Sequence, residues 1–243
     1  MNAAELAAQV GAYDRLFLEA RFEEAARVAE GLLWPLYRNG SEDSFMRLLS
    51  NTVTTTTSST ISLWMTLGDI LYKRDAYDRA RAFYLEALKL APQESEDAAK
   101  LLYSIGNTQF LEGDQLQARE YYEKSLALAT KLKLVACEAE SLVQLSETAR
   151  GLGDFDQAEQ LARRSLEINL RDQRSQGTTR SVQSLCNIAL YLDATGRRES
   201  AKEVLRLCLS SVIEQTDKQS LPFINQALAQ LGLTDAHLND KTD

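Results

Sequence analysis

Four alanines recur along this chain at nearly constant intervals. Ala80, Ala118, Ala158 and Ala201 follow one another at separations of 38, 40 and 43 residues, and each opens a run with helical apolar spacing. A period of 34 to about 45 residues is typical of an α-solenoid, in which one unit cannot bury its apolar face and neighbouring units must stack to form a core. The interval therefore predicts an all-α fold of stacked helix–turn–helix repeats.

The clearest repeat covers residues 61–94, where Asp75 separates two helical patterns and Pro92 ends the second. Each pattern gathers apolar and small residues on one helix face: Trp64, Leu67, Gly68 and Leu71 in the first, and Ala80, Tyr84, Ala87 and Leu88 in the second. These residues resemble the tetratricopeptide repeat, whose signature is Trp-x-x-Leu-Gly, a small residue at the helix crossing, an aromatic residue four positions later, a further Ala and a closing Pro. Leu71 replaces one aromatic residue of that pattern.

The same register continues to residue 215. Gly113, Gly153 and Gly196 each lie five residues before a repeat alanine, where a left-handed backbone would end the first helix at no steric cost. The later repeats lack a closing proline and are longer than 34 residues, so we expect their second helices to extend by a turn, as in the longer-repeat branch of the family.

The resemblance predicts a single superhelical domain over residues 1–233, followed by a polar tail at 234–243. Its parts are a degenerate repeat (6–38), an insertion (39–60), four repeats (61–94, 99–134, 139–174 and 182–215) and a C-terminal capping helix (218–232). Residues 50–60 of the insertion are rich in Ser and Thr. A solvated linker is the favoured interpretation, and a phosphorylated or ligand-closing loop is the alternative.

Composition limits the classes of partner. The net charge is −8, and 27 Lys and Arg are interleaved with 35 Asp and Glu, so a surface that tracks nucleic-acid phosphates is not expected. No apolar stretch approaches about 20 residues and the N-terminus lacks a signal-peptide pattern, which predicts no membrane insertion and a cytoplasmic location. Cys137, Cys186 and Cys208 lie within helical patterns and are expected to be buried free thiols.

No enzyme, cofactor or metal site is indicated. The single histidine, His237, lies in the predicted tail, which argues against His-based triads and multi-histidine metal sites. The Gly-Asp pairs at 113–114 and 153–154 sit between two helical patterns and are interpreted as helix stops rather than phosphate loops.

The first helices of stacked repeats line a concave groove, and the register predicts which residues face it. Trp64, Tyr84 and Tyr122 are expected in the core. The predicted peptide-binding residues are Met65, Asp69, Tyr72, Tyr103, Asn107, Phe110, Gln144, Glu147, Gln183, Asn187 and Leu190. Their amides could bond the backbone of an extended peptide while the aromatic rings supply apolar pockets. The equally weighted alternative is a solvated polar helix face.

Some members of the family grip the C-terminal carboxylates of heat-shock chaperones with Lys, Asn and Arg on successive first helices. The matching positions here hold Tyr103, Asn107, Gln144, Gln183 and Asn187. The basic residues are missing, so that specificity is not expected. The predicted function is a non-enzymatic protein–protein interaction scaffold that binds a peptide segment, with self-association possible. The alternatives are a ligand- or peptide-responsive regulatory module and a secretion or assembly chaperone.

Overall fold

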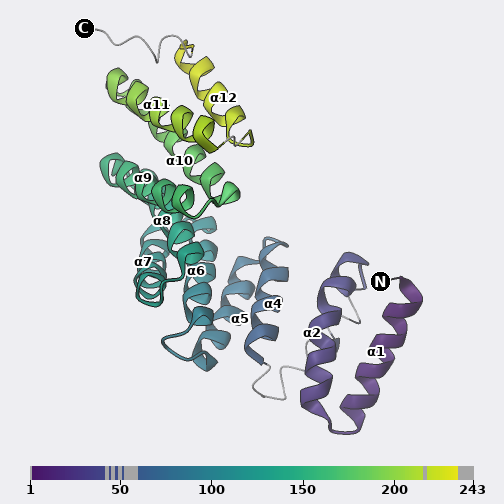
Figure 1. Ribbon diagram of the computed structural model, residues 1–243. Coiled ribbons are helices and arrows are strands. Elements are labelled where there is room, and N and C mark those ends of the chain that lie inside the picture. The colour runs from purple at the N-terminus through teal and green to yellow at the C-terminus, as the bar shows by residue number, and fades with distance from the viewer. Residues whose placement is uncertain are drawn as a thin grey trace. The chain divides into compact units, whose positions relative to one another are not determined.

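The computed structural model describes residues 2–41, 44, 47–48, 51, 60–215 and 218–234 (Figure 1). In this part of the chain there are eleven helices and no strands, which confirms the predicted all-α class. The helices belong to two compact units, Met1–Glu112 and Gly113–Asp243. Each unit is described by itself, and the single domain predicted over 1–233 stays a prediction.

The N-terminal unit contains five described helices. They are α1 (Ala3–Leu18), α2 (Phe22–Arg38), α4 (Thr60–Tyr72), α5 (Tyr77–Leu90) and α6 (Glu96–Leu111). One apolar cluster joins Tyr13 of α1 and Leu33 of α2 to Leu67 and Ile70 of α4. Lys73, just beyond α4, lies over the Trp34 ring at 4.4 Å from its centroid, which adds a cation–π contact to the packing of α2 against α4.

The described residues of the C-terminal unit form six helices, which follow one another in sequence order along the stack (Figure 1). They are α7 (Gln115–Leu132), α8 (Val135–Gly151), α9 (Phe155–Arg171), α10 (Ser175–Ala194), α11 (Arg198–Gln215) and α12 (Leu221–Leu231). Buried hydroxyl pairs bridge neighbouring helices, with Ser165 and Ser181 2.9 Å apart and Ser125 and Ser141 3.1 Å apart. These pairs satisfy polar groups that would otherwise be buried without a partner.

The helix crossings have the small residues that the register predicts. Ala80, Ala118, Ala158 and Ala201 are all fully buried. At the α8–α9 crossing the Ser146 hydroxyl donates to the Ala158 carbonyl oxygen at 2.7 Å. A larger side chain at an alanine of this kind would push the two backbones apart.

The helix ends follow the predicted turns. Gly153 has φ of 85°, a left-handed value that closes α8, and the Asp154 side chain then accepts a bond from the Gln157 amide at the start of α9. The Gly-Asp pair is therefore a helix stop followed by a cap. The second helices of the later repeats have 17 or 18 residues, whereas α5, before Pro92, has 14. The predicted extra turn is confirmed.

Two predicted segments fall largely outside the described residues. Of the insertion at 39–60, the structure describes 39–41, 44, 47–48, 51 and 60, and of the tail it describes only residue 234. His237 lies outside the described residues. All three cysteines are buried and free, as predicted.

Candidate functional site: the first-helix faces

We use "first-helix face" for the surface that carries the predicted binding residues in each unit. In the N-terminal unit it consists of Met65, Asp69, Tyr72, Tyr103, Asn107 and Phe110 on α4 and α6. In the C-terminal unit it consists of Gln144, Glu147, Gln183, Asn187 and Leu190 on α8 and α10. Nine of these eleven side chains are half-buried, and Asp69 and Gln183 are exposed.

Asp69 is held by the core of its own repeat. The Tyr84 hydroxyl donates to the Asp69 carboxylate at 2.7 Å, and the Tyr84 ring lies against Gly68. Desolvation raises the pKa of Asp69, while the Tyr84 hydroxyl and the charge of Lys73 act in the opposite direction. The Asp69 carboxylate therefore already has one partner.

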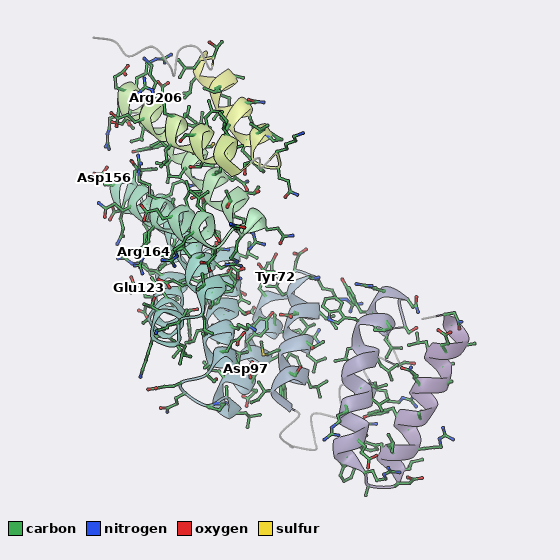
Figure 2. All side chains as sticks on the ribbon, in the orientation of Figure 1. Tyr72, Asp97, Glu123, Asp156, Arg164 and Arg206 are labelled. Carbon is green, nitrogen blue, oxygen red and sulfur yellow. The ribbon has the colours of Figure 1, made fainter. Side chains whose placement is uncertain are left out.

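Tyr72, which is labelled in Figure 2, has two other tyrosines, Tyr77 and Tyr103, as neighbours in the N-terminal unit. The rings of Tyr72 and Tyr77 meet edge to face with 5.6 Å between centroids. Burial, together with the neighbouring Tyr103 and Asp75, raises the pKa of Tyr72. The hydrogen bond that the Tyr77 hydroxyl donates to Asp75, 2.7 Å long, raises the pKa of Tyr77 to about 12. Both tyrosines are thus neutral hydrogen-bonding groups at ordinary pH.

Glu147, the carboxylate predicted on the α8 face, pairs with an arginine of the same helix. Both Nε and a terminal nitrogen of Arg150 donate to one Glu147 oxygen, at 3.0 and 2.7 Å. The pair is partly exposed, so it contributes little stability but neutralises the charge of Glu147 locally.

Three predicted residues of α10 line one pocket together with α12. The pocket holds about 290 Å³, and its lining residues are Gln183, Cys186, Asn187 and Leu190 from α10 and Phe223, Gln226, Ala227 and Gln230 from α12. None of these eight side chains carries a formal charge at neutral pH. The α12 residues were missed from the sequence because that helix was expected only to cap the array.

α12 occupies the place of a further first helix. Its N-terminal end meets that of α10, where the Ser220 hydroxyl donates to Thr179 Oγ1 at 3.2 Å. Its C-terminal end meets that of α10 through Arg198, which donates to the Leu231 carbonyl oxygen and to Asp193, both at 2.9 Å. The two helices therefore run in the same direction, as first helices of successive repeats do.

A sequence signal for this role exists. Gln226 follows Gln183 by 43 residues and Gln230 follows Asn187 by 43, the same interval that separates Ala158 from Ala201. The amide pattern of α10 is thus repeated on α12 at the repeat period.

The aromatic residues assigned to the core are there. Tyr84 and Tyr122 are buried, and Trp64 is 9% exposed with its ring 5.2 Å from that of Phe83. The second helices of the C-terminal unit carry charged side chains, among them Glu123, Arg164 and Arg206 (Figure 2). Glu123 pairs with Arg119 at 2.8 Å, and Arg164 pairs with Glu138 at 2.7 Å.

No group of three or more His, Cys, Asp or Glu side chains within the described ranges is arranged to hold a metal ion. Among the helices described, none combines the length and apolar character needed to cross a bilayer.

Comparison with models of protein families shows which family this chain belongs to. Tetratricopeptide-repeat models match residues 59–131, 97–171 and 182–211. The chain belongs to the tetratricopeptide-repeat family. Tetratricopeptide-repeat proteins are in general non-enzymatic protein-interaction scaffolds that bind other proteins.

Solved structures share the fold of this tetratricopeptide-repeat chain at low sequence identity. BtubC (BKLC) from P. vanneervenii has a TM-score of 0.64 and 18% identity, with 89% of this chain and 93% of that one covered. A Rap protein complexed with competence and sporulation factor has a TM-score of 0.60 and 12% identity, with 97% of this chain and 74% of that one covered. The signal-transduction ATPase PH0952 from Pyrococcus horikoshii has a tetratricopeptide-repeat sensor. Its TM-score is 0.69 and its identity 14%, with 96% of this chain and 40% of that one covered. No curated protein sequence matches the chain significantly.

Proposed function

We propose that this chain is a non-enzymatic scaffold that binds an extended peptide segment of another protein on its first-helix faces. The observation that carries the proposal is the pocket between α10 and α12, which gathers Gln183, Asn187 and Leu190 with amides of α12. A concave site with a few convergent polar groups among apolar ones is the usual form of a ligand site.

The chemistry of both first-helix faces suits a peptide main chain. A carboxamide donates and accepts hydrogen bonds, so Asn107 or Asn187 can pair with a peptide N–H and a peptide C=O at once. Half-buried apolar groups such as Phe110 and Leu190 can contact the apolar side chains of the bound peptide. A cytoplasmic location and the lack of nucleic-acid partners remain predictions from composition.

Affinity capture of partners followed by a binding assay with variants tests this function. Asn107→Ala and Asn187→Ala should each leave the fold intact and weaken partner binding by about 1–3 kcal/mol, because a desolvated peptide group loses its bond. Lys89→Ala is the control, since Lys89 lies exposed on the second helix α5 and pairs with Glu86 in the same helix. Unchanged affinity in both Asn variants would exclude the first-helix faces as the binding site.

A ligand-responsive regulator is the second candidate. The similar PH0952 carries a tetratricopeptide repeat described as a sensor, and the similar Rap protein was solved with competence and sporulation factor bound. A regulator should become more compact when its ligand binds, which small-angle scattering would detect, whereas a plain scaffold should not. A chaperone, the third alternative, should co-purify with one client in a constant ratio.

A further inference from the structure

The pocket between α10 and α12 has walls that are held in place before any ligand arrives. The contacts of Ser220 and Arg198 pin both ends of α12 to the α10–α11 hairpin. Ile224 and Leu228 of α12 are buried in the core of the C-terminal unit beneath the pocket. Preorganised walls bind a ligand without first losing the entropy of ordering.

The lining combines two kinds of group. Gln183, Asn187, Gln226 and Gln230 supply four carboxamides, and Cys186, Leu190, Phe223 and Ala227 supply apolar surface. The volume of about 290 Å³ lies at the lower limit for a whole small-molecule ligand, which is roughly 300 Å³. A pocket of this size suits one side chain and the peptide groups beside it.

Charge decides which side chain can enter. No residue of the lining has an acidic or basic side chain that is charged at neutral pH. A Lys, Arg, Asp or Glu side chain would lose its hydration here without gaining a partner of opposite charge. An apolar side chain has no such hydration to lose, and its transfer out of water lowers the free energy of binding.

We infer that this pocket is the anchor subsite of the binding face and takes an uncharged apolar side chain of an extended partner segment. The carboxamides of α10 and α12 bond the peptide groups on either side of that anchor. The inference rests on the proposed function, and it assigns to α12 a wall of the binding site in addition to its packing role.

The test uses the full chain and a phage-displayed library of random dodecapeptides as the probe. Enriched peptides are synthesised and their affinities measured for the wild type, Gln226→Glu and Gln230→Glu. Both glutamines are exposed, so the folded state should persist, which a circular-dichroism melt verifies. Each variant should bind about tenfold more weakly or worse, because a bound segment would desolvate an unpaired carboxylate. Gln160→Glu, an exposed glutamine of α9 outside the pocket, should stay within about twofold of the wild type.

The anchor is then varied in the peptide. Replacement of its apolar residue by Lys and by Glu should weaken binding to a similar extent, since a neutral pocket rejects both signs of charge. Enriched peptides that bind Gln226→Glu and Gln230→Glu as tightly as the wild type, or whose anchor is charged, would overturn the inference. The proposed function would survive that result if Asn107→Ala still weakened binding. A library that yields no binders would overturn both.

Discussion

At the scale of single residues, close backbone approach explains why Gly68 is a glycine. A Cβ atom at this position would clash with the Tyr84 ring, which is 2% exposed and tied to Asp69 through its hydroxyl. The ring cannot move away without breaking that bond. We therefore expect Gly68→Ala to lower the free energy of unfolding by about 1–3 kcal/mol, the usual cost of overpacking a core, as measured by urea denaturation.

Gly31 provides the matched control in the same unit. It lies in α2, is exposed, and a Cβ atom there would meet nothing within 4 Å. Gly31→Ala should raise the free energy of unfolding by about 0.5–1 kcal/mol, because Ala loses less backbone freedom in a helix than Gly. Shifts of the same sign in both variants would contradict the account of the Gly68–Tyr84 contact.

At the scale of helices, the crossing alanine decides whether a hairpin can close. Ala158 is fully buried where α9 crosses α8, and its carbonyl oxygen accepts the Ser146 hydroxyl. Ala158→Arg should destabilise the protein by more than the about 1–3 kcal/mol of overpacking, because a charge is buried as well. Thermal unfolding followed by circular dichroism measures the shift.

Ala127→Arg tests whether the destabilisation expected for Ala158→Arg comes from the helix crossing. Ala127 lies mid-helix in α7 of the same unit, and it is exposed. The same substitution there should change the free energy of unfolding by no more than about 0.5 kcal/mol. If the two variants melt alike, the repeat register assigned to α8 and α9 is wrong.

At the scale of the whole molecule, the structure confirms the fold that the sequence predicted, whereas the peptide-binding residues stay a prediction. Packing residues such as Ala118 and Gly153 recur at the repeat period, so the hairpins and their turns could be located from spacing alone. Spacing shows which face a residue occupies but not its partner on another helix, so the bond from Tyr84 of α5 to Asp69 of α4 could not be foreseen. α12 follows the fourth repeat of the pattern, so the sequence predicted a cap at this place rather than a wall of the candidate site.

Site-specific photo-crosslinking can detect whether partners contact the first-helix faces, as we propose. The photoreactive residue p-benzoylphenylalanine replaces Tyr103 or Leu190 on the first-helix faces, and Lys89 or Gln160 on the exposed sides of the second helices α5 and α9. A partner obtained by affinity capture is added before irradiation. We predict a crosslinked product from Tyr103 and from Leu190, and none from Lys89 or Gln160. Crosslinking confined to the Lys89 and Gln160 positions would show that partners bind the second helices and would contradict the proposed binding on the first-helix faces.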